Sequence, residues 1–139
     1  MKSILNGALK WSTNGTATYG TSGDLSNAAL YSTPIKLEQI DRYAIQIVTT
    51  GATVTGAFKL QASNDVPDRE DPDTNLPMNP APASMNWTDI DGSSTTVTVA
   101  GSVVWNAQGV GYRWVRVVWT ESGTAAGAVT GRINGKGDL

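Results

Sequence analysis

Apolar and polar residues alternate with a period of two along most of this chain, which is the spacing of a β-strand rather than a helix. The stretches 43–50 and 58–63 both alternate in this way, and the segment 51–56, with a glycine at each end, separates them. The pattern predicts two strands that pair as an antiparallel hairpin with a loop of several residues.

The stretch 112–120 is the strongest strand in the sequence. Its bulky side chains fall on both faces, with Tyr112, Trp114, Arg116 and Val118 on one and Arg113, Val115, Val117 and Trp119 on the other. A strand that is bulky on both faces is central in its sheet or covered on both sides. We therefore expect its tryptophans and valines to form the core.

Shorter apolar runs predict further strands at 28–31, 35–37, 86–90, 95–100, 102–105 and 127–134. Residues 25–30 are rich in alanine and leucine and predict a single helical turn, and 135–139 reads as a tail. Short strands separated by regular turn signals indicate an all-β protein, an antiparallel β-sandwich for which a jelly roll is one arrangement. A length of 139 residues fits a single domain, 1–139.

The segment 64–84 differs from the rest of the chain. It holds five acidic residues and five prolines, namely Asp65, Asp68, Glu70, Asp71, Asp73, Pro67, Pro72, Pro77, Pro80 and Pro82. Proline lacks an N–H donor and fixes φ, so this density predicts an extended loop rather than a helix or a ladder. Loops of more than about 15 residues are uncommon in compact domains and are often functional.

Three interpretations of this acidic, proline-rich loop remain open. Its carboxylates are the type of ligand that Ca²⁺ prefers, but they lack the glycine and fixed alternation of a calcium-binding loop. It is also compatible with a plain solvated loop, or with an arm that lies on a neighbouring subunit, for which proline lowers the cost of ordering. The arm hypothesis, which includes the N-terminal segment as a second contact, gives these candidate partner-binding residues: Asp68, Arg69, Glu70, Asp71, Asp73, Leu76, Met78 and Trp11.

The amino-acid composition excludes most kinds of catalytic site. The chain has no cysteine and no histidine, so thiol and imidazole catalysis and zinc sites built on these residues are excluded. Asp89 and Asp91 are two residues apart, but Asp91-Gly92 is a turn signal rather than half of a carboxylate pair. We expect no enzyme activity, no cofactor and no metal.

Charge and hydropathy also limit the partners. The formal net charge is −2, and no stretch has the length of a membrane span or the apolar run of a signal peptide. We therefore expect no direct nucleic-acid or membrane partner, and we expect the few basic residues near the C-terminal strands to serve cross-strand packing and pairing.

Five tryptophans allow three roles. They can pack in the core, anchor a protein interface, or form a platform on which sugar rings stack. The last role would make the chain a carbohydrate-binding module for host attachment, and it requires a row of exposed aromatic side chains on one face.

Several motifs follow one another in a familiar order. They are Phe58-Lys59-Leu60-Gln61-Ala62-Ser63-Asn64-Asp65, then Asn86-Trp87-Thr88-Asp89-Ile90, then Tyr112-Arg113-Trp114-Val115-Arg116-Val117, Ser122-Gly123-Thr124 and the closing Ile133-Asn134-Gly135-Lys136-Gly137. Together, over residues 43–137, they resemble the small β-sandwich virion proteins of tailed bacteriophages, and most of all a capsid cement or decoration protein.

The resemblance implies a location on the capsid surface of a virion. It implies that the chain binds the major capsid protein as a dimer or trimer and stabilises contacts between neighbouring capsid subunits. A tail or baseplate accessory protein is the nearest alternative within the same group.

Overall fold

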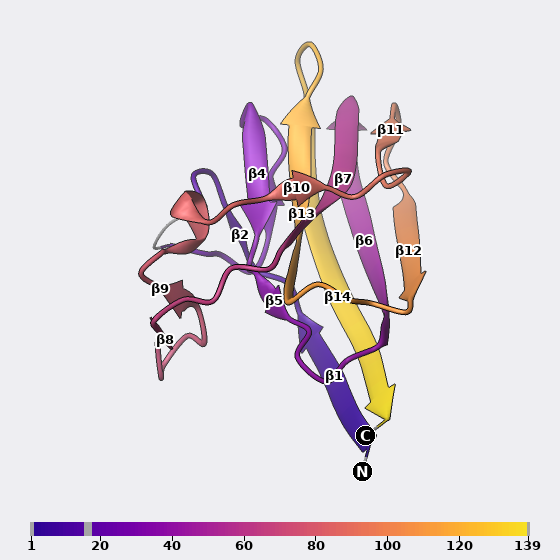
Figure 1. Ribbon diagram of the computed structural model, residues 1–139. Coiled ribbons are helices and arrows are strands. Elements are labelled where there is room, and N and C mark those ends of the chain that lie inside the picture. Colours follow the sequence, from indigo (N-terminus) through magenta and orange to yellow (C-terminus); the bar gives the residue numbers. More distant parts are fainter. Residues whose placement is uncertain (1, 16–17, 139) are drawn as a thin grey trace.

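Two antiparallel sheets pack face to face in the computed structural model, which describes residues 2–15 and 18–138 (Figure 1). Sheet A has the order β1 (Lys2–Ala8), β14 (Ala126–Asp138), β6 (Arg42–Thr53), β12 (Ser102–Gln108), with β3 (Gly23–Asp24) beside β14. Sheet B has the order β10 (Thr88–Asp89), β7 (Gly56–Ser63), β13 (Trp114–Glu121), β4 (Ala29–Ser32), β2 (Trp11–Ser12), with β11 (Thr95–Val97) on β7 and β5 (Ile35–Lys36) on β13. The all-β antiparallel sandwich is confirmed, whereas the jelly-roll arrangement is not.

Strand β13 is central in sheet B, as its two bulky faces predict. It pairs with β7 on one side and with β4 and β5 on the other. Val115, Val117 and Trp119 are fully buried in the core between the sheets, together with Ile45 and Ile47 of sheet A. Its other face, which carries Trp114, Arg116 and Val118, is also buried, but it lies on the outer side of sheet B.

The predicted hairpin of strands β6 and β7 is wrong, although both strands exist. β6 lies in sheet A and β7 in sheet B, so the chain crosses from one sheet to the other at Val54, which is buried. The crossing is tight: a Cβ at Gly56 would collide with the Trp119 ring and lie 2.5 Å from the Thr120 carbonyl oxygen. Two strands that face each other across a core alternate in the same way as two that pair, so periodicity alone does not distinguish these arrangements.

The two ends of the chain also differ from expectation. Residues 25–30 form a turn and the start of β4 rather than a helical turn. Residues 135–138 are not a tail but continue β14. Over residues 132–138 this strand pairs with β1, a strand that the sequence did not predict, from Lys2↔Asp138 to Ala8↔Arg132. The glycines and polar residues of this ribbon have little preference for β-strands. Its stability therefore comes from the backbone ladder and from the neighbouring strand β6.

Candidate partner-binding site

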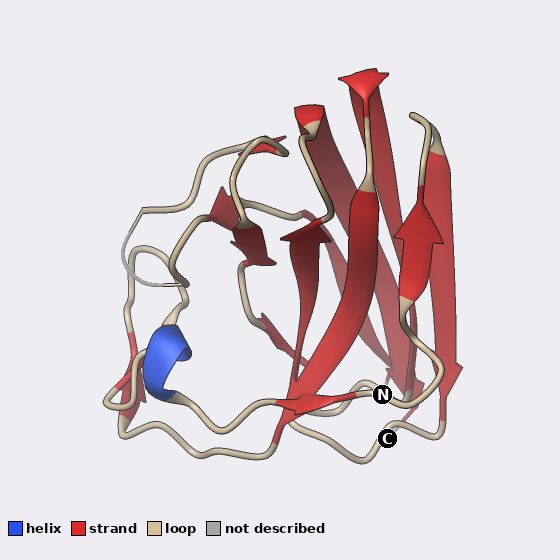
Figure 2. Cartoon of the chain, turned by 90° about the horizontal axis from the view of Figure 1, so that it is seen from above, coloured by secondary structure: helices blue, strands red, loops and turns tan. Residues whose placement is uncertain are grey.

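The segment 64–84, called the arm from here on, is folded rather than loose. It contains a two-residue ladder of β8 (Arg69–Glu70) and β9 (Pro77–Met78), followed by the 3-10 turn η1 (Pro82–Ser84). The prediction of an extended loop without ladder or helical turn is therefore wrong in detail. Pro77 is compatible with a ladder of this kind, because an isolated two-strand ribbon leaves its outer edge free of hydrogen bonds. Seen from above, η1 and the β8–β9 ribbon stand to one side of the sandwich (Figure 2).

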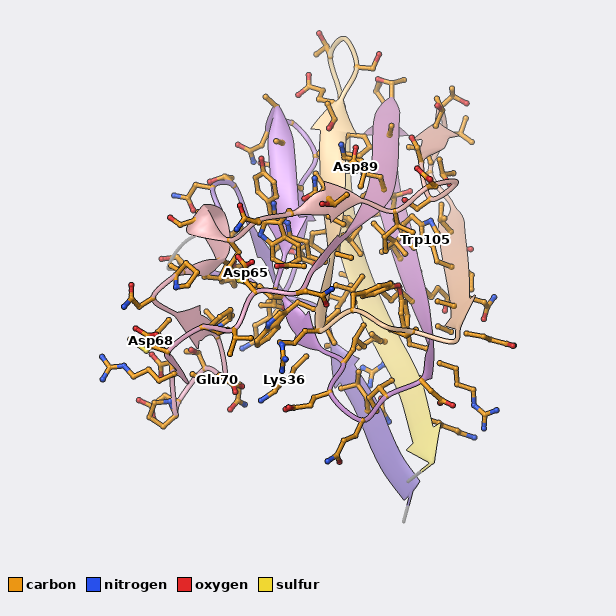
Figure 3. All side chains as sticks on the ribbon, viewed as in Figure 1. Lys36, Asp65, Asp68, Glu70, Asp89 and Trp105 are labelled. Carbon is orange, nitrogen blue, oxygen red and sulfur yellow. The ribbon has the colours of Figure 1, made fainter. Side chains whose placement is uncertain are left out.

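Polar contacts fix the arm to the sandwich. The Lys36 ammonium on β5 pairs with the Glu70 carboxylate at 2.6 Å, and this hydrogen bond raises the pKa of Lys36 (Figure 3). The Asp65 carboxylate accepts the backbone N–H of Asn86 at 2.7 Å, and the Asp65 carbonyl accepts the Trp114 indole N–H at 3.1 Å. The arm is thus held in one shape before any partner arrives, which lowers the entropy lost on binding.

Arg116 lies beside the base of the arm and stabilises the outer face of sheet B. Its guanidinium stacks on the rings of Tyr31 and Trp87, with centroid distances of 4.5 Å and 4.2 Å, and its Nε–H donates to Gln61 Oε1 at 2.9 Å. Arg116 is 7 % exposed, and burial lowers its pKa to about 10, so it stays charged at neutral pH. The Trp87 indole N–H in turn donates to the Pro82 carbonyl at 2.8 Å, which links this stack to the arm.

The structure brings three of the predicted residues together. Asp71, Leu76 and Met78 line one hollow of about 240 Å³ on the arm, whose other walls are Thr74, Pro77, Ala81 and Pro82. The hollow is mostly apolar, and an acidic residue stands at its rim. It has the character of a small receptor for an apolar side chain of another protein.

The acidic residues of the arm have different roles. Asp71 accepts the backbone N–H groups of Asp73 at 2.8 Å and Thr74 at 3.3 Å, so its carboxylate shapes the tip. Asp68 accepts the Asn79 side-chain amide at 2.6 Å. Asp68, Arg69 and Asp73 are exposed. Within residues 2–15 and 18–138 there is no group of three acidic side chains that could hold a metal ion.

Trp11 is not part of a partner-binding surface, which corrects the sequence-based prediction. It is 3 % exposed and belongs to the core cluster, and its backbone pairs with Ser32 of β4. The sequence places Trp11 among polar residues and glycine, which suggests a surface position, but the surrounding chain folds over it.

The tryptophans do not form a sugar platform. Four are buried, Trp11, Trp105, Trp114 and Trp119, and the fifth, Trp87, is half-buried with its ring occupied by Arg116. Trp105 donates its indole N–H to the Ser93 carbonyl at 2.8 Å inside the protein. The described residues therefore lack the row of exposed aromatic rings that the carbohydrate-binding alternative requires.

A second surface was missed by sequence analysis. The outer face of sheet A, called the open face from here on, is covered by no other element of residues 2–15 and 18–138. Its residues point to solvent in register across four strands: Ile4, Asn6 and Ala8 on β1; Lys136, Asn134, Arg132 and Thr130 on β14; Arg42, Ala44, Gln46 and Val48 on β6; Gln108, Asn106, Val104 and Ser102 on β12. Alternation predicts that such a face exists, but which charges gather on it depends on the strand order.

Comparisons with known proteins give a fold likeness and no family. No protein family matches the sequence, and no curated protein matches it. The SPBc2 prophage-derived protein YomS is 12 % identical, with a TM-score of 0.49, over 98 % of this chain and 95 % of its own. A structure from Bacillus endospore appendages, described as disulfide-linked pili, is 12 % identical with a TM-score of 0.49 over 100 % and 91 %.

A third structure is chitosan-binding module 1 of a chitosanase/glucanase from Paenibacillus sp. IK-5. It is 16 % identical, with a TM-score of 0.49, over 95 % of this chain and 93 % of its own. At this distance the likeness says nothing about what the chain binds. Within the described residues, no helix has the length and apolar character needed to cross a membrane.

Proposed function

We propose that this chain is a non-catalytic structural protein of a phage virion. It binds the outside of the capsid and stabilises contacts between major capsid subunits. The sequence motifs that resemble small virion proteins support this assignment, and the single structural observation that carries it is the arm. A rigid sandwich that presents a fixed, protruding hairpin with an apolar hollow is suited to docking on another protein.

The hollow on the arm supplies the contact to the shell. Leu76 and Met78 are half-buried in the free protein and line the hollow together with the buried Pro77 and Pro82. An apolar side chain from the shell would displace water from this hollow, and each fully buried side chain of that kind contributes about 1.5–3 kcal/mol. Many such contacts repeated over a shell give avidity without any single strong site.

Shell binding by variants of the hollow tests this proposal. Leu76→Asn combined with Met78→Gln makes the hollow polar while leaving the ion pair of Lys36 and Glu70 in place. The matched control is Val99→Asn, because Val99 is 73 % exposed and lies outside the arm. Removing the whole arm is less informative, since it would also uncover Trp114.

The measurement is co-sedimentation of each purified variant with undecorated shells of the same phage. We expect the double variant to bind about tenfold more weakly and the control to bind like the wild type. Undiminished binding of the double variant, with its fold verified by near-UV circular dichroism, would contradict the proposal.

A further inference from the structure

The open face carries an unbalanced positive charge. Arg42, Arg132 and Lys136 are exposed on it, and none of the open-face residues named above is acidic. No ion pair reaches these three cations within the described part of the chain, where Arg132 contacts only the Asn6 amide oxygen, at 3.4 Å. This is unusual for a molecule whose formal net charge is −2.

Two of the cations are direct neighbours. Lys136 on β14 and Arg42 on β6 are opposite each other in the ladder. Like charges in directly opposite positions of a sheet destabilise it, so the pair is unfavourable unless an anion lies between them. A hollow of about 260 Å³ opens at this point; beside Arg42 and Lys136 it is lined by Ala44, Asn106, Asn134 and Gln108, among others. Two cations and three amides around a small residue form a receptor for carboxylates.

The chain itself carries the complementary surface. Between residues 65 and 73 the arm has five carboxylates and one guanidinium. Asp68 and Asp73 are exposed there and make no ion pair within the described residues. The arm stands to one side of the sandwich, so its tip is free to reach another molecule (Figure 2).

We propose that the arm of one copy docks on the open face of a second copy, with Asp68 and Asp73 against Arg42 and Lys136. The contact is heterologous, because it joins two different surfaces, and such contacts close into rings when the rotation between copies permits. The inference goes beyond shell binding and does not depend on it.

Other anionic occupants fit the open face less well. Single-stranded nucleic acid is bound on surfaces that pair cations with aromatic stacking platforms, and no aromatic side chain is on this face. Duplex DNA binding usually neutralises about 6–10 phosphates, more than three cations provide. Acidic polysaccharide would likewise find no ring to stack on.

Charge reversal with rescue tests the docking. The face variant is Arg42→Glu with Lys136→Glu, the arm variant is Asp68→Lys with Asp73→Lys, and a third protein carries all four changes. Asp73→Lys alone is a gentler arm variant, because the Asp73 carboxylate makes no hydrogen bond within the described residues. The control, Asp91→Lys, reverses an exposed charge that belongs to neither surface.

The readout is sedimentation equilibrium of the isolated protein at about 50 mM and about 500 mM salt, where screening differs strongly. We expect concentration-dependent association of the wild type and the control, weakened at high salt. We expect the face variant and the arm variant each to weaken it by about tenfold or more, and the fourfold variant to restore it.

Three results would overturn the docking: a wild type that stays monomeric at every concentration, reversals without effect, or a fourfold variant that fails to recover. Tighter binding of duplex DNA or hyaluronate than of a second copy, lost in the face variant, would also overturn it. Because no shells are present in this experiment, its failure would leave the shell-binding proposal untouched.

Discussion

Arg116 offers the sharpest test of how the outer face of sheet B is stabilised. We expect Arg116→Lys to destabilise the protein even though the charge is kept. Lysine is a compact point charge that does not stack as a planar group on two rings, and it lacks the Nε–H that Gln61 accepts at 2.9 Å.

The magnitude follows from the contacts. Each cation–π contact of a desolvated guanidinium contributes about 2 kcal/mol, and a hydrogen bond from a charged donor contributes about 1.5–3 kcal/mol. The penalty of burying the charge opposes these contributions and is several kcal/mol. We expect a loss of about 2 kcal/mol for Arg116→Lys and about 3 kcal/mol for Arg116→Ala, which also removes the packed side-chain stem.

Urea unfolding monitored by tryptophan fluorescence measures these losses. Arg132→Lys is the matched control, because Arg132 is exposed, and we expect a change within about 0.5 kcal/mol. The reasoning would be refuted if Arg116→Lys were as stable as the wild type. It would also fail if Arg116→Met were more stable than the wild type, since the buried charge would then be a net cost.

Three further outcomes follow from the same structure. Gly56→Ala should cost about 3 kcal/mol in urea unfolding because its Cβ would meet the Trp119 ring, whereas Gly101→Ala, where a Cβ meets nothing within 4 Å, should change stability by less than about 1 kcal/mol. Burial raises the pKa of Tyr19 to about 12. The contribution of neutral Tyr19 to the free energy of unfolding is therefore fully present below the unfolded pKa of about 10, and it is lost as pH rises through about 12. Tyr19→Phe removes a buried hydroxyl that has no hydrogen-bond partner among the described residues, and it should reduce this alkaline loss, as measured by thermal unfolding at pH 9 to 12; an unchanged pH profile would contradict it. Lys36→Gln breaks a partly exposed ion pair and should lower global stability by less than about 1 kcal/mol while making the arm more susceptible to limited proteolysis, and equal cleavage rates would count against the proposed role of Lys36.

Periodicity predicted the long central strands but not their partners. The alternation in 43–50 and 58–63 gave both strands correctly, and the two bulky faces of 112–120 gave the central position of β13. The same signal is compatible with strands in one sheet or in facing sheets, so the crossing at Val54 was not predictable from it. Strand β1 was missed because its pairing with β14 depends on backbone hydrogen bonds, which its side chains do not reveal.

The candidate site was predictable in part. Proline and acidic density located the arm, and Leu76 and Met78 do line its hollow. Trp11 was misplaced because its polar neighbours in sequence say nothing about which segments fold over it. The cluster of Arg42 and Lys136 was invisible to sequence reading, because residues 94 positions apart become neighbours only when β6 and β14 pair.

The pairing of the first strand with the last has a consequence for how the molecule folds. Lys2 on β1 meets Asp138 on β14, and β14 also separates β1 from β6. During synthesis, β1 therefore has no ladder to join until β14 has left the ribosome. Closure of a very long loop between β1 and β14 must precede completion of this layer, so we expect folding on a slow timescale of milliseconds to seconds, roughly that of other β proteins dominated by distant pairings.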